Sequence, residues 1–343
     1  MTVIPSCMFP TTVVFVDDDP GFLRHIAAEL SSRVTSYKFC TNPIAALDFL
    51  NKEYKPDPFT NRCMDRPEEE RFEHHSMNVN IRLLHQEIYN PKRFDQISTV
   101  VIDHDMPGMN GLELCEKITD PNIQKILLTG VANESVVIDA FNKQIIQGFI
   151  RKQDNQVFDL VSQAISEAQR TYFNTLSKPI LEILVNNPNI PPTALNEPGF
   201  NDIFQKILEE NKTVEYYLFE SSGCFLFLDK HGNDSALFTY PEDLLNIHCE
   251  IAESHLDEHP ENKKEVLSFI GDIQKRKKIF CYHKRDNIMW PKITEWKSYL
   301  HPATKFSGNS NYFYAYEPKL LDIDRGGLLS FSTYQDGQSL EVA

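Results

Sequence analysis

The sequence lacks the cysteine patterns that mark disulfide frameworks and structural zinc sites. Its 7 cysteines are scattered along 343 residues and include no C-x-x-C pair. Such usage is typical of a reducing compartment, so we expect a cytoplasmic protein. Basic residues are too few to balance the acidic ones, which leaves a net charge of −15. A general affinity for nucleic acid or anionic membranes is therefore not expected, although a local basic patch remains open.

Long apolar runs are also missing. The most apolar stretches, 216–219 and 225–228, fall far short of the roughly 20 residues that cross a bilayer. The first residues contain prolines but neither Lys nor Arg, so no signal peptide is expected. The chain should therefore be soluble and have no membrane partner. Its hydrophobic share of 41% is enough for two domains with cores of their own.

Apolar, β-branched runs alternate with amphipathic stretches from residue 12 to about residue 172. Strands are predicted at 11–16, 37–40, 98–103, 123–129 and 148–151, and helices near 22–30, 43–50, 111–118, 133–142 and 155–174. This alternation predicts a doubly wound α/β fold with five parallel strands covered on both faces. A segment at about 54–97 interrupts this alternation. It is far longer than the usual connection between a helix and the next strand, which has roughly 2–6 residues. It is interpreted as an insertion, partly helical at 82–89.

A Pro- and Asn-rich stretch at 186–199 indicates a domain boundary. Before it, apolar residues recur at three- and four-residue steps from Val157 to Leu184, which predicts a long helix that Pro179 kinks or restarts. After it, strands are predicted at 214–220, 224–230, 235–240 and 311–318, and helices near 200–212, 241–253 and 261–276. The predicted parts are a first domain at 1–172, a helical extension and linker at 173–198, and an α+β domain with an antiparallel sheet at 199–343.

Side chains of complementary chemistry follow four strands of the first domain. Asp17, Asp18 and Asp103 supply carboxylates, Thr129 a hydroxyl and Lys152 an ammonium group. Parallel strands deliver their carboxyl ends to one edge of the sheet, where ligands bind. Carboxylate oxygens suit Mg²⁺, and an ionised carboxylate beside a cation can attack phosphorus. Taken alone, the acidic run could cap the next helix, but all five groups together favour a magnesium and phosphoryl site.

This arrangement resembles the CheY-like receiver domain of two-component response regulators, which has a flavodoxin-like fold. The resemblance covers about residues 1–172 and includes a D-x-x-M-P-x-x-x-G motif from Asp103 to Gly111. It implies Asp103 as the phosphoacceptor, Asp18 as a direct Mg²⁺ ligand with further ligands from Asp17, Asp103 and the backbone carbonyl of Asp105, Lys152 as the lysine of the family, and Thr129 and Phe149 as the switch residues. The implied partners are a sensor histidine kinase or phosphotransfer protein, and a second copy of the chain.

The resemblance also implies a readout. Phosphorylation is expected to favour homodimerisation through the face formed by 133–172, while the long helix carries the signal to the second domain. The apolar positions of 157–168 are better explained as core contacts. Gln153 replaces the proline that usually follows the family lysine, so a trans bond is expected after Lys152. Phe149 lacks a tyrosine hydroxyl and can report only through its rotamer.

The second domain has no DNA-binding pattern that identifies its output. The basic run of Lys275, Arg276, Lys277 and Lys278, with 283–285 and Trp290 nearby, is a candidate nucleic-acid contact, but a solvated helix end is the commoner explanation. A DNA-binding transcriptional regulator is therefore one alternative. A receiver-gated enzyme of nuclease or phosphatase type is another, and its loose candidate residues are His231, Asp234, His248 and His283. The layout of the whole chain also resembles quorum-sensing response regulators of Legionella.

Overall fold

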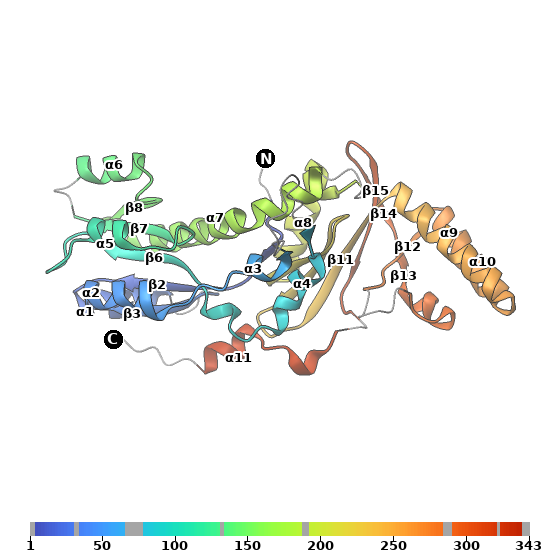
Figure 1. The fold of residues 1–343 in the computed structure, drawn as a ribbon, viewed down its shortest axis with the longest axis horizontal. Coiled ribbons are helices and arrows are strands. Elements are labelled where there is room, and N and C mark those ends of the chain that lie inside the picture. Colours follow the sequence, from blue (N-terminus) through green and yellow to red (C-terminus); the bar gives the residue numbers. More distant parts are fainter. Residues whose placement is uncertain are drawn as a thin grey trace, which may run out of the picture. The chain divides into compact units, whose positions relative to one another are not determined.

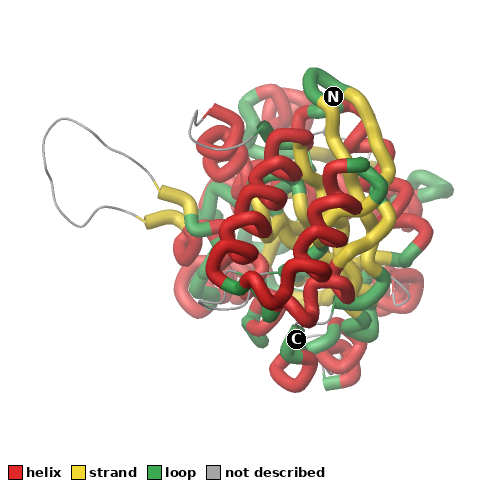
Figure 2. The backbone as a smooth tube through the Cα atoms, turned by 90° about the vertical axis from the view of Figure 1, so that its right-hand side faces the viewer, coloured by secondary structure: helices red, strands yellow, loops and turns green. Residues whose placement is uncertain are grey.

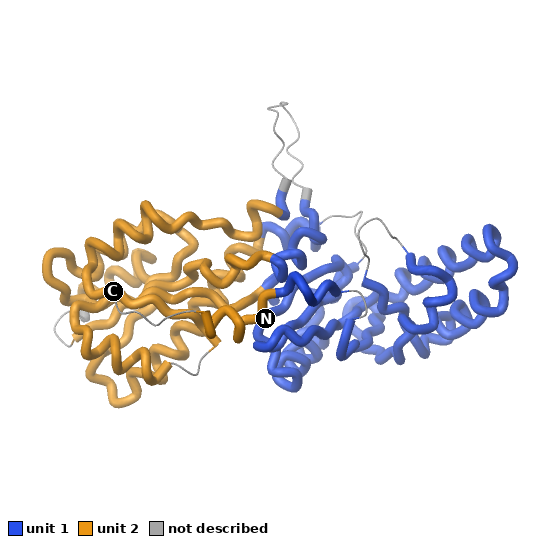
Figure 3. Tube along the Cα trace, turned by 90° about the horizontal axis from the view of Figure 1, so that it is seen from below, with its two compact units in different colours: residues 1–7, 63–89, 179–328 blue, residues 8–62, 90–178, 329–343 orange. Residues whose placement is uncertain are grey.

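The protein is described here by a computed structural model that covers residues 4–30, 34–65, 78–130, 134–186, 192–283, 290–320 and 323–337. The chain forms two compact units, each assembled from segments far apart in the sequence (Figure 3). The parallel-sheet unit comprises 8–62, 90–178 and 329–343, and the antiparallel-sheet unit comprises 1–7, 63–89 and 179–328.

The parallel-sheet unit is built on a five-stranded sheet in the order β3-β2-β6-β7-β8, and every neighbouring pair is parallel (Figure 1). The strands are β2 (Thr12–Val16), β3 (Ser36–Cys40), β6 (Ile97–Asp103), β7 (Gln124–Thr129) and β8 (Gly148–Arg151). The predicted doubly wound fold is confirmed. β2 and β6 are buried along their whole length, and strands buried on both faces need largely apolar sequences. The sequence pattern could therefore predict them.

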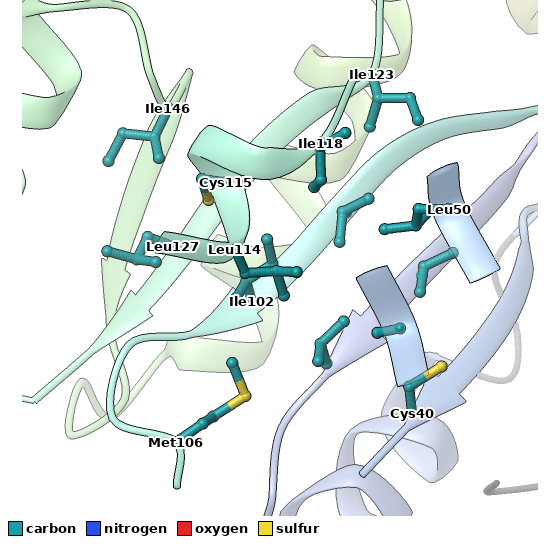
Figure 4. Packing of buried hydrophobic residues seen from close by; sticks show 14 of the residues in the cluster. Cys40, Leu50, Ile102, Met106, Leu114, Cys115, Ile118, Ile123, Leu127 and Ile146 are labelled. Carbon is teal, nitrogen blue, oxygen red and sulfur yellow. The ribbon is translucent and has the colours of Figure 1, made fainter. Parts of the chain in front are cut away.

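Helices cover both faces of this sheet. They are α1 (Pro20–Leu30), α2 (Pro43–Asp48), which continues as a π-helix at Phe49–Glu53, α5 (Gly111–Lys117), α6 (Glu134–Asn142) and α7 (Val157–Asn186). Side chains of α2, α5 and α6 pack with Val14, Ile102 and Leu127 in the core of one face. Figure 4 shows Leu114 and Cys115 of α5 beside Ile102 and Leu127. Side chains of α1 and α7 pack with Phe15 and Leu128 on the other. Each face therefore has its own apolar core.

Helix α7 runs without a break through Pro179. Proline removes one backbone donor from a helix interior and crowds the preceding turn, so a restart was one of the two expected outcomes. The helix instead continues for almost two further turns. Its early apolar positions, including Val157, Val161 and Ile165, belong to the core of the parallel-sheet unit, as predicted for 157–168.

The antiparallel-sheet unit contains a six-stranded sheet in the order β1-β9-β10-β11-β15-β14. The strands are β1 (Cys7–Met8), β9 (Thr213–Glu220), β10 (Cys224–Asp229), β11 (Asp234–Pro241), β14 (Thr304–Ser307) and β15 (Asn311–Glu317). The neighbouring pairs from β9 to β14 in this order are all antiparallel, which confirms the predicted α+β character. Phe200 and Phe204 of α8 (Pro198–Glu210) pack against Phe225 of β10.

Shorter elements complete this unit. Helices α9 (Glu242–Glu258) and α10 (Lys263–Gln274) lie side by side as a hairpin (Figure 2). The remaining short elements are the strand pairs β4 (Met64–Asp65) with β5 (Asn78–Val79) and β12 (Lys278–Phe280) with β13 (Leu300–Pro302), and the helices α3 (Thr60–Cys63) and α4 (Ile81–His85). Helix α4 lies in the stretch predicted to be helical and packs on β9. A last helix, α11 (Phe331–Asp336), belongs to the parallel-sheet unit.

Candidate phosphoryl site at the edge of the parallel sheet

Three carboxylates meet at the carboxyl end of the parallel sheet. Asp17 directly follows β2, Asp103 is the last residue of the neighbouring strand β6, and Asp18 comes next to Asp17 in the chain. One oxygen from each lies within 4.8 Å of the other two. Asp17 and Asp103 are 1% and 6% exposed, whereas Asp18 is exposed to solvent. The parallel register thus brings together the acids that the sequence placed at strand ends.

Lys152 reaches this cluster from the strand at the edge of the sheet. It follows β8, and its backbone N–H donates to the carbonyl of Thr129 at 3.0 Å. Its Nζ lies 2.6 Å from Asp17 Oδ2 and 2.8 Å from Asp103 Oδ1. The bond between Lys152 and Gln153 is trans, as expected, since the described residues contain no cis peptide bond. One ammonium group therefore faces two buried carboxylates.

Burial and ion pairing compete at these groups. Burial raises the pKa of Asp17, and the contacts with Lys152 and the backbone N–H of Asp19 only partly offset it. Burial by itself would lower the pKa of Lys152, but its hydrogen bonds to Asp103 and Asp17 together outweigh this effect and raise the pKa. Lys152 is therefore firmly cationic, while the charge on Asp17 is held at a cost in free energy.

The donor set fits a hard divalent cation. Asp17 Oδ2 is fully buried, and it shares the ammonium of Lys152, which lies 2.6 Å away, with Asp103. Two buried carboxylates that share one ammonium group retain negative charge, which is costly unless a further cation meets it. Asp18 adds an exposed carboxylate at the mouth of the cluster. The expected capping role of the acidic run belongs to Asp19, whose Oδ1 accepts the N–H of Gly21 at 2.7 Å in the first turn of α1.

The loop after Asp103 holds the start of α5 against the strand end. Asn110 caps α5 by accepting the N–H of Glu113 at 2.9 Å, and the N–H of Gly111 donates to the carbonyl of His104 at 2.9 Å. A Cβ atom on Gly111 would lie 2.2 Å from the carbonyl oxygen of Asp103, so no other residue fits without a backbone shift. The glycine of the motif is thus explained by a close approach of two backbone segments.

The expected switch residues lie on the neighbouring strands. Thr129 ends β7, is 1% exposed, and its hydroxyl donates to the carbonyl of Gly130 at 2.9 Å. Phe149 is half-buried in β8 and meets Phe141 of α6 edge to face, with ring centroids 6.3 Å apart. These positions are compatible with switching, which stays a prediction. The side chain of Asp105 faces solvent, and its Oδ1 lies 2.7 Å from Nδ1 of the buried His104, a contact that the sequence did not indicate.

The basic run after α10 is mostly engaged within its own unit. Arg276 bonds to Glu242 at 3.2 Å and to Asn246 at 2.7 Å, and Lys278 bonds to Asp272 at 2.9 Å. Lys275 and Lys277 are exposed. Of the nearby residues, 284 and 285 lie outside the described part of the chain, while Trp290 stacks on Phe280. A nucleic-acid contact here remains a prediction. Of the four basic residues in the run, Lys275 and Lys277 could bind a phosphate without loss of the hydrogen bonds of Arg276 and Lys278.

The four candidate residues for an enzymatic output domain, His231, Asp234, His248 and His283, lie in different environments. Asp234 is buried in a bidentate ion pair with Arg325 at 2.7 and 3.0 Å. His248 packs among aromatic rings, including Tyr240. His231 is exposed in the turn after β10. His283 is different, because it lines a small cavity with other titratable groups.

The whole chain is similar to one solved structure in particular. The response regulator LqsR of Legionella pneumophila is 32% identical to it, with a TM-score of 0.77, and the match covers 99% of this chain and 98% of that one. The chain belongs to the two-component response regulators. The predicted resemblance is thereby confirmed for the family, and it extends over the second half of the chain, where motif reading found no output class.

Other solved structures match about half of this response regulator. A CheY-like receiver domain protein of Methanospirillum hungatei is 18% identical over 47% of this chain and 96% of that one, with a TM-score of 0.32. A receiver domain protein of Clostridium thermocellum is 18% identical over 50% of this chain and 98% of that one, with a TM-score of 0.31. No protein-family model and no curated protein matches the sequence. Within the described residues, no helix combines the length and apolarity needed to cross a bilayer.

Proposed function

We propose that this response regulator accepts a phosphoryl group on Asp103 from a sensor histidine kinase or a phosphotransfer protein. The observation that carries the proposal is the contact of one ammonium group, Lys152 Nζ, with both Asp17 and Asp103 at 2.6 and 2.8 Å. A lysine held between two acids at a strand edge is positioned to stabilise negative charge on a transferred phosphoryl group.

Each residue has a defined task in this proposal. An oxygen of Asp103 attacks the phosphorus of the donor, the bond between phosphorus and the donor breaks, and an acyl phosphate remains on Asp103. Asp17, Asp18, Asp103 and the backbone carbonyl of Asp105 would hold Mg²⁺, which supplies positive charge beside the phosphoryl oxygens when bound. Lys152 moves with the phosphoryl oxygens instead of pairing with Asp103. Thr129 turns from the Gly130 carbonyl to donate its hydroxyl to the phosphate.

The output follows from the packing of Phe149. Movement of Thr129 opens space beside β8, so Phe149 swings inward and changes its contact with Phe141 on α6. The altered face of 133–172 then favours a homodimer, and α7 carries the change to the antiparallel-sheet unit as a non-standard output domain. We assign that domain a regulatory role without enzymatic activity, in a cytoplasmic pathway of the quorum-sensing type. Predicted domains 1–172, 173–198 and 199–343 are the functional parts of this scheme.

Labelling with acetyl phosphate tests the phosphoacceptor. Wild-type protein with Mg²⁺ should gain one phosphoryl group by intact mass, and Asp103→Asn should gain none. Chelation of Mg²⁺ should slow labelling by about 100-fold or more, because charge stabilisation dominates this transfer. Asp105→Asn is the matched control, since its exposed side chain is not assigned a bond to phosphorus. Label that persists in Asp103→Asn would remove the assignment.

A further inference from the structure

The antiparallel-sheet unit contains a small cavity lined by titratable side chains. Its volume is about 60 Å³, and its walls include Cys281, His283, Tyr299, His301 and Glu317. One water needs roughly 10–15 Å³ on this measure, so the space suits an ion with a few waters or a very small ligand. Nothing in the receiver chemistry uses these residues.

Three separate elements fix the walls of this cavity. Cys281 and His283 follow β12, His301 lies in β13, and Glu317 ends β15 of the large sheet. Strands β12 and β13 are paired, and the N–H of Cys281 donates to the carbonyl of Tyr299 at 2.7 Å. Cys281, His301 and Glu317 therefore belong to a hydrogen-bonded framework of strands, and His283 lies shortly after β12.

Glu317 places a buried carboxylate oxygen beside this cavity. Its Oε2 is fully buried and accepts no directed hydrogen bond from the described residues. Nδ1 of His301 lies 2.7 Å from Glu317 Oε2. The carboxylate and this imidazole are thus two adjacent groups that can share a cation.

The chemistry of the walls selects one class of ligand. A carboxylate in the wall disfavours an anion, and two imidazoles with a thiol favour a transition metal over Mg²⁺ or Ca²⁺. The ring of the neighbouring His85 meets that of His283 edge to face, with centroids 4.8 Å apart.

We propose that this cavity binds a divalent transition metal of the Zn²⁺ type through Glu317, His301, His283 and Cys281. His301 Nδ1 and Glu317 Oε2 already lie side by side, 2.7 Å apart, somewhat closer than two ligands of one tetrahedral ion. In the described part of the chain only Asp17, Asp18 and Asp103 have three donor atoms within 4.8 Å of one another, so His283 and Cys281 must close on the metal by side-chain rotation. A thiol loses its proton when it binds a metal, so binding through Cys281 releases a proton.

Metal titration of the full-length protein tests this site. With excess Mg²⁺ present to occupy the acidic cluster, wild type should bind one equivalent of Co²⁺ with the visible bands of four-coordinate cobalt. Zn²⁺ should displace it and raise the Tm. Glu317→Gln and His301→Gln should each weaken Zn²⁺ binding by about 10-fold or more. Cys281→Ser should abolish the thiolate-to-cobalt charge-transfer band.

The control is His259→Ala, which alters an exposed histidine of the same unit outside the cavity. It should bind Co²⁺ and Zn²⁺ as wild type does. Failure of wild type to bind one equivalent overturns the proposal, and so does unchanged binding in Glu317→Gln and His301→Gln. If a variant does not fold, the thiolate-to-cobalt charge-transfer band of the wild type tests the proposal instead. Absence of this band would exclude Cys281 as a ligand. Phosphorylation of Asp103 is measured separately and does not depend on the result.

Discussion

Asp17 shows how a functional acid can weaken the fold that carries it. Burial raises its pKa in the folded protein above the unfolded value of 3.8, so its ionisation opposes folding. This cost begins as the pH rises through 3.8 and is complete above the raised value. In a chelated sample at neutral pH, we therefore expect Asp17→Asn to raise the Tm. The gain should shrink as the pH falls through the raised value and disappear below 3.8, because wild-type Asp17 is then protonated in both states.

Calorimetry with chelator from about pH 8 to about pH 3 measures this effect. Asp139→Asn is the control, since this residue forms only an exposed ion pair with Lys143 and should change the Tm little at any pH. A lower Tm for Asp17→Asn at neutral pH would mean that the ion pair with Lys152 outweighs the cost of burial.

Gly111 is a second residue whose identity follows from contact distances. An alanine Cβ there would meet the Asp103 carbonyl oxygen at 2.2 Å and Leu127 Cδ1 at 2.9 Å. Gly111→Ala should therefore lower the free energy of unfolding by about 1–3 kcal/mol and slow phosphorylation of Asp103. Chemical denaturation and the labelling assay measure the two effects. Gly148→Ala, where a Cβ has open space, should leave both nearly unchanged, and equal behaviour of the two variants would contradict the steric explanation.

The sequence could predict the gathering of the site residues but not all of their partners. Asp17, Asp103 and Lys152 follow strands, and the topology of a parallel sheet alone brings strand ends to one edge. The contact of His104 with Asp105 depends on rotamers, and the bonds of Arg276 to Glu242 depend on how α9 meets α10. Such contacts leave no periodic signal in the chain.

At the scale of elements, predictability followed length and burial. The strands of the parallel sheet were predicted to within one residue, because β2 and β6 are buried along their whole length and the shorter strands recur within the same strand–helix alternation. The predictions missed β1, β12, β13 and β14, which have two to four residues and, unlike the equally short β8, lie outside that alternation. Helix α11 was also missed, because its few residues form one and a half turns and its packing partner lies far away in the sequence.

That partner makes α11 a test of long-range packing. Phe331 is 1% exposed. Its ring meets that of Phe94, a residue just before β6, edge to face with centroids 5.2 Å apart. The hydroxyl of Tyr334 donates to Asp95 at 2.7 Å. Phe331→Ala should destabilise the parallel-sheet unit by about 3–5 kcal/mol, because it removes a fully buried aromatic ring.

Hydrogen exchange of β6 during chemical denaturation reports this loss. Gln335→Ala changes an exposed residue of the same helix and should have little effect. Unaltered exchange in Phe331→Ala would show that α11 docks without contributing to the stability of the sheet.

At the scale of the whole molecule, the two compact units are interleaved along the chain. Residues 63–89 group with the antiparallel-sheet unit, and residues 329–343 return to the parallel-sheet unit. Composition could indicate the linker at 186–199. It could not indicate which unit residues 63–89 or 329–343 join, because that depends on contacts between segments far apart in the sequence. Helix α7 contributes 157–178 to one unit and 179–186 to the other, and Pro179 is the first residue of the second part. The proposed signal route therefore passes through one continuous helix.

Dimerisation on phosphorylation is the whole-molecule consequence of the proposed site. Ile138 and Phe141 of α6 are 48% and 45% exposed, and Phe141 contacts the expected switch residue Phe149. Exposed apolar side chains beside a switch are suited to a partner surface that forms only in one state. Sedimentation with acetyl phosphate and Mg²⁺ should therefore show wild type shifting from monomer to dimer, while Ile138→Asp and Phe141→Asp weaken the dimer by about 10-fold or more, or ~1.4 kcal/mol.

Both variants should still be phosphorylated on Asp103, because α6 contributes no group to the acidic cluster. Val185→Asp is the matched control, since this apolar residue is similarly exposed, at 41%, but lies in the part of α7 that belongs to the other unit. It should dimerise as wild type does. Dimers of Ile138→Asp and Phe141→Asp as strong as those of wild type would move the interface elsewhere. A mass that stays unchanged on phosphorylation of wild type would instead reject dimerisation as the readout and leave the phosphoacceptor assignment intact.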